Sequence, residues 1–500
     1  MKLHSSYRCR ITWMECSEGA LHHTVMLHSD MADFFLQLIF LNPDFFSAAN
    51  PLGALRELEK LTLRTEDNPQ PLFPFSGEYA RYPSYLRRAA INFAFGLASS
   101  FFTLSKNAEK ARAEGKKVAK PSLPTISKAY PVFYEKLQIQ QVSDYSFRIN
   151  VFWGNTWKWA LVHVRHSDID YIRHHCADRE PESPRLAKFG KDWYIVFSFV
   201  EEVKLDDENI FSQTIVSVDL GINNACTCVV MKADGTVLAR KFLKLGSEKA
   251  HLVKILSAIR GAKRRGVKRC RALWAKAKGI NKEISVKTAR FIMEVIQEAE
   301  LKHGVKISAV VMEHLDLRGR KRGANRERLH HWRAIYVQQL VTDKAHRLGK
   351  RISRICAWNT SKLAFDGSGK VERDEHNYSL CTFRNGKRCN CDFSAAMNIG
   401  ARYFVREIMK ALTEKEQNTL CLERGIELLK KSLIGQSVRT AGAKDLSGAS
   451  DYSRRTLCTY STLRALNAGL RRLGRTVRTS AARTVRADEA SGQKFPDVLR

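Results

Sequence analysis

The sequence predicts a multidomain α/β protein whose second half forms a mixed β-sheet with helices on both faces. Three observations lead to this fold class. A length of 500 residues suggests two to four units, at about 100–200 residues per domain. A content of 44% hydrophobic and 27% charged residues is ordinary for globular proteins and excludes wholesale disorder. Strand-like runs gather in two regions of the chain, and helical patterns separate them.

The charge of the chain points to a polyanionic partner. It has 84 Lys and Arg against 51 Asp and Glu, a net charge of +33, and such an excess repels itself unless a polyanion neutralises it. The most apolar run, 34–41, is about eight residues, whereas a membrane-spanning helix needs about 20. The first residues, 1–13, lack the apolar core of a signal peptide. We therefore expect nucleic acid and no membrane as partner, and a cytoplasmic protein associated with the nucleoid through DNA.

The first half combines a β domain with a helical insert. Residues 6–15 alternate as a strand does, the pattern is helical over 31–113, and Pro121 and Pro124 then break it. Strand patterning returns between 145 and 203. The predicted domains are a β domain, 1–30 and 125–210, interrupted by a helical domain, 31–124.

The second half begins with strands and continues with strands that alternate with helices. The predicted strands are 214–220, 225–232, 237–243, 307–313 and 351–357. An Asp234-Gly235 turn makes a hairpin of the second and third strands. The predicted helices are 248–303, 325–348 and 394–410. This order matches an RNase H-like fold, which we place at 211–412.

The remaining residues, 413–500, are predicted to be a basic tail that is partly disordered. The stretch 454–486 carries nine arginines and no acid. Such like-charged blocks repel one another and favour disorder or a polyanion.

Three acids stand beside buried runs in the second half. Asp219 and Glu313 end apolar strands, and Asp392 precedes a helix. Three carboxylates that converge at one sheet edge repel one another, and divalent cations between them would stabilise them. Oxygen ligands suit Mg²⁺, and two such ions about 3.5–4 Å apart can promote phosphodiester hydrolysis. Asp219, Glu313 and Asp392 are therefore the candidate catalytic and metal-binding residues for two Mg²⁺ ions.

At these three positions the chain resembles a RuvC-type nuclease domain. The sequence between the acids is similar to that of the TnpB (OrfB) proteins of small transposons and of the related type V CRISPR effectors. The motifs that carry this likeness are Glu313-His314-Leu315, Asn359-Thr360-Ser361, a Cys-containing hairpin, and Asp392 followed by Ala395-Ala396-Met397-Asn398. The resemblance is specific over about 215–404, looser upstream and weak in the tail.

The resemblance implies an RNA-guided DNA endonuclease. A β-barrel wedge domain, its inserted helical recognition domain and the RuvC-like domain would hold a guide RNA. The protein would read a short motif beside the double-stranded target DNA, and pairing with the guide would read the rest. Asp219 and Asp392 would bridge or bind the metals, Glu313 would hold the second ion, and the metal would activate the attacking water. The resemblance implies no particular oligomeric state.

The chain departs from this family at its expected zinc ribbon. The family usually has two Cys-x-x-Cys pairs before the last acid, and none occurs in the insert at about 362–391. Structural zinc takes four Cys or His ligands, and only Cys356, Cys381, Cys389 and Cys391 could supply them here. Asn385-Gly386 favours a type I′ turn. We therefore expect a metal-free β-hairpin rather than a zinc site.

Two basic segments are candidate nucleic-acid-binding surfaces. The stretch 254–278 holds ten basic residues and no acid, and a second cluster follows Glu313. A solvated helix face normally mixes signs, so such runs predict phosphate contacts. The predicted contact residues are Lys263, Arg264, Arg265, Lys268, Arg269, Arg271, Arg320, Lys321, Arg322 and Arg326.

Three other functions remain open from the sequence. A guide-dependent repressor would bind DNA without cutting it, although all three acids are present. A guide-independent resolvase or transposase could use a similar three-acid site. An ATPase of the actin and sugar-kinase type would use Asp219-Leu220-Gly221 and Asp366-Gly367-Ser368-Gly369 as phosphate loops, but it would not need the +33 charge.

Overall fold

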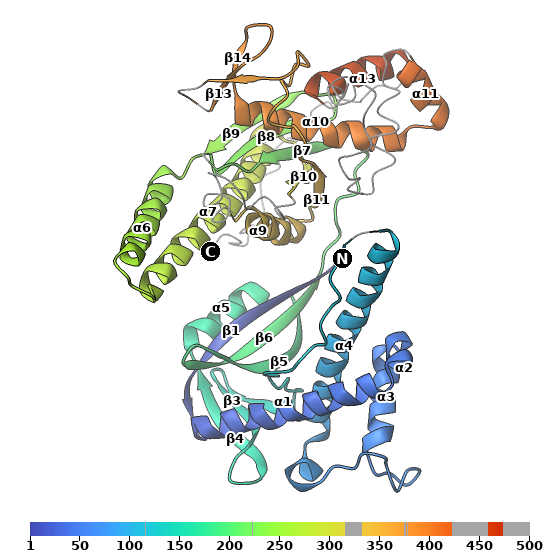
Figure 1. Ribbon diagram of the computed structural model, residues 1–500, viewed down its shortest axis with the longest axis vertical. Helices are drawn as coiled ribbons and strands as arrows, with labels where there is room; N and C mark the ends of the chain where they lie inside the picture. The colour runs from blue at the N-terminus through green and yellow to red at the C-terminus, as the bar shows by residue number, and fades with distance from the viewer. Residues whose placement is uncertain are drawn as a thin grey trace, which may run out of the picture. The chain divides into compact units, whose positions relative to one another are not determined.

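The chain forms two compact units in a computed structural model (Figure 1). One unit is Lys2–Glu202, and the other is Val203 onward together with Met1. The structure describes residues 1–115, 117–222, 224–315, 333–374, 377, 379–422 and 459–473. Both units combine helices with sheets, so the α/β class is confirmed.

A six-stranded antiparallel sheet organises the first unit, in the order β2-β3-β4-β1-β6-β5. The long strand β1 lies in the middle because it pairs with β4 near its end and with β6 along most of its length. The strands are β1 (Lys2–Met14), β2 (Ile139–Ser143), β3 (Ser146–Phe152), β4 (Trp157–Val164), β5 (Glu180–Phe189) and β6 (Asp192–Glu202).

This sheet is curled. The segment just before β2 bonds to the opposite edge strand, β5: the amide of Phe133 donates to the carbonyl of Pro184 (2.7 Å), and that of Leu186 to Pro131 (3.0 Å). The chain that enters β2 at one edge therefore also pairs with β5 at the other edge.

Helices are inserted between β1 and β2, and α1 begins earlier than the helical pattern suggests. Its first residue is Glu18 rather than a residue near 31, because the Ser17 side chain caps it by accepting from the amide of Ala20. The helices of this unit are α1 (Glu18–Leu41), α2 (Pro43–Ala48), α3 (Pro51–Thr62), the 3₁₀ turn η1 (Gly77–Arg81), α4 (Ser84–Ala113) and, after β4, α5 (His166–Cys176).

Helix α1 is longer and more apolar than the short run at 34–41 indicated. Among the described residues, α1 is the single helix that is long and apolar enough to cross a membrane. However, 61% of its most apolar window is buried inside the protein. Its Leu21, Phe35 and Ile39 belong to the same core as Leu86 and Ile91 of α4. The apolar surface of α1 thus has a partner within its own unit.

The second unit contains a five-stranded mixed sheet, in the order β11-β10-β7-β8-β9. Strands β7, β8 and β9 are antiparallel, whereas β10 is parallel to β7, and β11 to β10. The strands are β7 (Thr214–Asp219), β8 (Cys226–Lys232), β9 (Val237–Leu243), β10 (Ile307–His314) and β11 (Arg351–Cys356). All five lie where the sequence predicts strands.

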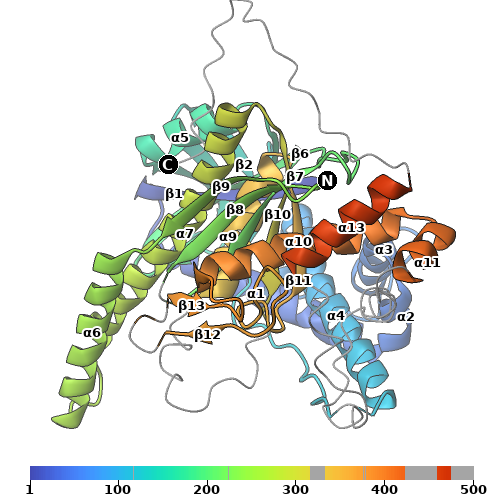
Figure 2. The ribbon, with the colours of Figure 1, turned by 90° about the horizontal axis from the view of Figure 1, so that it is seen from above.

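Helices cover both faces of this sheet (Figure 1). Side chains such as Ile215 and Val311 form one core with α10 (Cys391–Ala411). The alternate residues, such as Val216 and Val310, form another with α7 (Arg271–His303) and α9 (Ala334–Arg347). Helix α6 (Gly246–Arg264) packs on the first half of α7, and the pair runs out from the sheet (Figure 2). A small sheet of β12 (Glu372–Arg373), β13 (Leu380–Thr382) and β14 (Arg388–Asn390) precedes α10.

Two helices occur within the stretch expected to be a basic tail, α11 (Glu414–Leu422) and α13 (Tyr460–Arg472). Leu463, Leu466 and Leu470 of α13 are fully buried in the core of α10. Their i, i+3, i+7 spacing is that of an amphipathic helix, and the surrounding arginines obscured it. The other tail residues, 423–458 and 474–500, lie outside the described part of the chain, so the disorder predicted for them stays a prediction.

Helix α13 should contribute to the stability of the second unit. Replacing the fully buried Leu466 with Ala should lower the free energy of unfolding by about 2–5 kcal/mol, because the substitution leaves a cavity. Urea denaturation followed by fluorescence measures this loss. Leu473→Ala is the matched control, since Leu473 is 37% exposed just after the same helix. Equal losses for the two variants would contradict the packing of α13 on α10.

Candidate active site and nucleic-acid interface

Asp219 and Glu313 end neighbouring parallel strands. The register pairs Val218 of β7 with Met312 of β10, so the acids that follow stand at the same edge of the sheet. Both lie on the face that α10 covers, since side chains alternate along a strand. Asp219 is buried, with 8% of its surface exposed.

Asp392 reaches this edge from the first turn of α10. The side chain of Asn390 caps the helix by accepting from the amides of Asp392 and Phe393, both at 3.0 Å. Gly400 lets α10 lie close to β7, because a Cβ there would be 3.1 Å from the hydroxyl of Ser217. A close approach of helix to sheet thus positions the third acid.

Two buried polar residues orient the acids, and neither was predicted from the sequence as a site residue. Asn224 donates from Nδ2 to Oδ2 of Asp392 (2.5 Å), and Thr360 donates from its hydroxyl to Oε1 of Glu313. Asn224 is 6% exposed and Thr360 is 2% exposed. The Asn359-Thr360-Ser361 motif was the available signal for Thr360, whereas Asn224 depends on the turn between β7 and β8.

The three carboxylates influence one another electrostatically. The pKa of Asp219 is raised well above its ordinary value, first by burial and then by the negative charges of Glu313 and Asp392. Arg373 of β12 partly offsets the increase. The three acids singled out in the sequence are therefore brought together at one site, and their mutual repulsion makes the charge on Asp219 costly.

Lys249 of α6 also lies at this site. Its ammonium donates to the carbonyl of Ile222 (2.9 Å). Burial lowers the pKa of Lys249 to about 8, and the negative charge of Asp392 acts in the opposite direction. A cation beside Asp392 was not predicted from the sequence, because α6 is distant from α10 along the chain.

The donor atoms of the acidic site fit a divalent cation. Carboxylate oxygens are the ligands that Mg²⁺ prefers, and a cation would relieve the repulsion that raises the pKa of Asp219. Thr227, which pairs with Asp219 across β7 and β8, has a buried hydroxyl without a partner among the described residues. In the described part of the chain, no three His, Cys, Asp or Glu side chains are arranged to hold one metal ion. The site thus matches Mg²⁺ by chemistry and charge, without a completed set of ligands.

The expected hairpin is present before α10. Cys381 of β13 pairs with Cys389 of β14, and Gly386 occupies the turn with a φ of 78°. Cys381 and Cys391 are buried in a small core with Phe383. Cys356 is exposed at the end of β11, outside this core.

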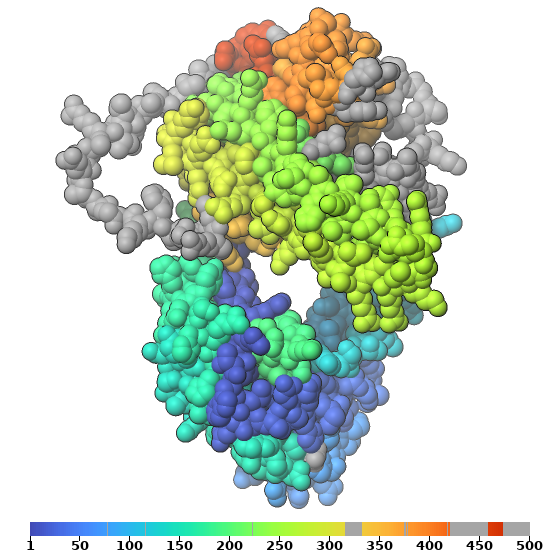
Figure 3. All heavy atoms as spheres, turned by 90° about the vertical axis from the view of Figure 1, so that its left-hand side faces the viewer, coloured from blue at the N-terminus to red at the C-terminus, as the bar shows by residue number. Residues whose placement is uncertain are grey.

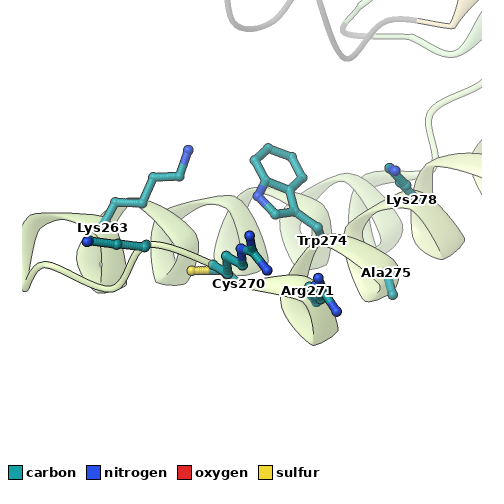
Figure 4. Close-up of a pocket in the computed structure, with 8 residues that line it drawn as sticks. Lys263, Cys270, Arg271, Trp274, Ala275 and Lys278 are labelled. Carbon is teal, nitrogen blue, oxygen red and sulfur yellow. The ribbon is translucent and has the colours of Figure 1, made fainter.

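The α6–α7 hairpin, residues 246–303, presents the first predicted basic surface. A pocket of about 580 Å³ lies at its tip, where the indole of Trp274 and the side chain of Lys263 project on the same side (Figure 4). The Lys263 ammonium is 5.7 Å from the indole centroid. The pocket is lined by Lys263, Lys268, Arg269, Cys270, Arg271, Trp274, Ala275 and Lys278. Four of the predicted contact residues therefore line one pocket, and Trp274 lines it as well.

The positive charges of this hairpin are largely unneutralised. Within the described residues, Lys268, Arg269, Arg271 and Lys278 form no ion pair with an acid. Arg264 and Arg265, at the end of α6, are exposed as well. Atoms of α6 and α7 stand at the surface of their unit (Figure 3). The other predicted contacts, Arg320, Lys321, Arg322 and Arg326, lie outside the described residues.

Comparisons with known proteins give three findings. A sequence model of the Aq_aa04 family matches residues 5–153, within the first unit. No curated protein matches the chain. Similar solved structures include a Cas12f1–sgRNA–target DNA complex, with 14% identity, a TM-score of 0.44, and coverage of 80% of this chain and 98% of that one.

Two further structures are comparably similar. The mini RNA-guided endonuclease CRISPR-Cas_phi3 has 10% identity, a TM-score of 0.39, and coverage of 80% and 92% of the two chains. CasPhi-2 (Cas12j) bound to crRNA and phosphorothioate DNA has 9% identity, a TM-score of 0.36, and coverage of 79% and 90%.

Because ionising Asp219 costs the folded protein free energy, a neutral side chain at this position should stabilise the fold. Its raised pKa means that the native state holds the proton more tightly than the unfolded chain does, so stability is lost as pH rises above the ordinary value of 3.8. Asp219→Asn should therefore increase the free energy of unfolding at neutral pH without divalent cations, and the gain should shrink toward pH 4. Urea denaturation at the two pH values measures it.

The control for this measurement is Asp207→Asn. The Asp207 side chain is 83% exposed in an ion pair with Lys204, and neutralising it should change stability little. A loss of stability in Asp219→Asn at neutral pH would show that the ionised Asp219 carboxylate does not cost the fold stability as described.

Proposed function

We propose that this protein is an RNA-guided, Mg²⁺-dependent DNA endonuclease with a RuvC-like active site. The observation that carries the proposal is the meeting of Asp219, Glu313 and Asp392 at one sheet edge, where burial and then the charges of the other two acids raise the pKa of Asp219. Acids that repel one another at a buried site are costly for a fold, and cation binding gives them a function.

Each group at the acidic site has a proposed role. Asp219, Glu313 and Asp392 would hold the ions, which supply charge neutralisation and an activated water for phosphodiester hydrolysis. Asn224 keeps the Asp392 carboxylate oriented, and Thr360 does the same for Glu313. Lys249 places a positive charge beside Asp392, where the negative charge of a scissile phosphate would arrive.

The remaining parts of the proposal concern guidance. The curled sheet of the first unit would act as the wedge domain, and its helices α1 to α4 as the recognition domain. Guide RNA and target DNA would be bound in part by the α6–α7 hairpin, whose unpaired cations suit phosphates. The motifs around the acids support a relative of TnpB or a compact type V effector.

The hydrogen bonds of Asp366 argue against the ATPase alternative. The second phosphate loop of such a protein would use Asp366. Instead, the Asp366 carboxylate accepts from the amide and hydroxyl of Ser368 and from the side chain of Asn385. Asp366 thus stabilises its own turn and the adjacent hairpin.

Substituting the acids should separate cutting from binding. Asp219→Ala, Glu313→Gln and Asp392→Ala should each reduce DNA cleavage by roughly a thousandfold or more, because metal stabilisation is worth several kcal/mol and about 1.4 kcal/mol is tenfold in rate. Chelation with EDTA should abolish cleavage in the same way. Binding of guide RNA and DNA, measured by filter retention, should persist in the variants.

A control and a decisive outcome accompany these variants. Asp207→Ala removes an acid of the same unit that is 83% exposed and outside the acidic site, and the variant should cut DNA at close to the normal rate. Normal cleavage by Glu313→Gln, or cleavage in EDTA, would refute the assigned site.

The α6–α7 hairpin should make binding dependent on salt. Replacing Lys263, Lys268 and Arg271 with Gln should lower the slope of log affinity against log salt by about 2 to 3, at about 0.7–0.9 per lost phosphate contact. Titrations of labelled nucleic acid at several salt concentrations measure the slope. Gln substitutions at Lys2, Lys204 and Lys410, which are paired with acids, remove equal charge elsewhere and should change it much less. Equal slopes for both triple variants would argue against a specific surface.

A further inference from the structure

A second pocket lies beside the acidic site, on the face of the sheet that α10 covers. Its volume is about 350 Å³, within the range of small-ligand pockets. Strand β9 builds one side of it, and the β13–β14 hairpin with the adjoining first turn of α10, far along the chain from β9, builds the other. The lining residues are Arg240, Phe242, Phe365, Leu380, Lys387, Arg388, Cys389, Asn390 and Phe393.

Aromatic rings provide much of the wall. Phe365 and Phe393 contact each other edge to face, with centroids 5.9 Å apart. Phe242 is 38% exposed, which is unusual for a Phe on a sheet face that a helix covers. The pocket therefore offers ring surface to a flat ligand.

The cations at this pocket are directed at the rings. The guanidinium of Arg240 is 5.6 Å from the centroid of Phe393, and the ammonium of Lys387 is 5.0 Å from that of Phe365. Among the described residues neither cation has an ion pair, whereas Arg388 is paired with Asp374 at 2.9 Å. Two positive charges are thus available at the pocket to an anionic ligand.

The register of the sheet places this pocket close to the acids. Asp219 pairs with Thr227, and Thr227 pairs with Phe242, so the three residues form one row across β7, β8 and β9. At about 4.8 Å between strands, Asp219 and Phe242 are roughly 10 Å apart along the row. On the other side of the pocket, Phe393 directly follows Asp392 in α10.

We propose that this pocket binds an unpaired base of the DNA strand to be cut and so sets which phosphodiester reaches the acids. The aromatic walls would stack the base, and Arg240 and Lys387 would contact its flanking phosphates. A distance of roughly 10 Å corresponds to about three nucleotides at a rise of 3.4 Å. The inference rests on the proposed nuclease function and adds the residues that position its substrate.

A photocrosslinking experiment locates the bound base. The full-length protein is incubated without divalent cations with short single-stranded DNA carrying 5-iodouracil, which crosslinks to stacked aromatic side chains, and the crosslinked peptides are identified by mass spectrometry. The proposal predicts crosslinks at Phe242 or Phe393. Crosslinks confined to other segments would overturn it.

An affinity cycle then measures the stacking. The Phe393→Leu variant keeps an apolar side chain but loses the ring, and its binding is compared for intact DNA and for the same strand with abasic positions. For each protein, the affinity for intact DNA is divided by the affinity for abasic DNA. This ratio should be roughly tenfold larger for the unmodified protein than for Phe393→Leu, because one stacked base contributes about a factor of ten to affinity. Phe291→Leu, at a half-buried ring of α7 on the opposite face, is the matched control and should behave like the unmodified protein.

The outcomes separate this inference from the proposed function. Equal effects of base removal on the protein and on Phe393→Leu would overturn the pocket assignment, even if the protein cuts DNA. Crosslinking and coupling at Phe393 in a protein that cuts nothing would support the pocket and refute the nuclease. A clear preference of the pocket for RNA over DNA of the same sequence would also overturn the proposal, because the strand bound there would not be the one cut.

Discussion

The electrostatic repulsion among three carboxylates is the constraint on which the second unit depends. Asp219, Glu313 and Asp392 come from β7, β10 and α10, and burial together with the charges of the other two acids raises the pKa of Asp219. Such an arrangement survives folding only if the surrounding packing is strong. Here that packing consists of two apolar cores on opposite faces of one sheet, with α10 held close to β7 at Gly400.

The distribution of the remaining charge complements this site. The chain as a whole carries +33, yet three of its acids meet at the edge of the second unit's sheet, where a cation and a phosphate would meet. Cations without acidic partners lie at the tip of the α6–α7 hairpin and at the aromatic pocket beside Asp392. A strand of nucleic acid would thus be attracted along basic surfaces, while its reacting phosphate would lie near Lys249 and the three acids.

The sequence predicts the elements of the second unit well, because buried strands and hairpin turns have local signals. All five strands follow from the apolar pattern, and the turn between β8 and β9 follows from the Asp234-Gly235 dipeptide. Asn224, Lys249 and Thr360 were missed as site residues, because each becomes one only through a tertiary contact. Helix α13 was missed because its three buried leucines are spaced among arginines. The start of α1 was placed too far along the chain, since a single capping side chain, Ser17, determines it.

The most direct test of the account is cleavage by the protein together with the RNA that it retains when expressed from its own locus. The retained RNA is sequenced, and the complex is given Mg²⁺ and a DNA duplex that matches the variable part of that RNA, or a scrambled duplex. The account predicts one discrete RNA species and cleavage of the matching duplex alone. Retention of only random RNA that moderate salt removes, or equal cleavage of both duplexes, would contradict RNA guidance and leave a guide-independent nuclease.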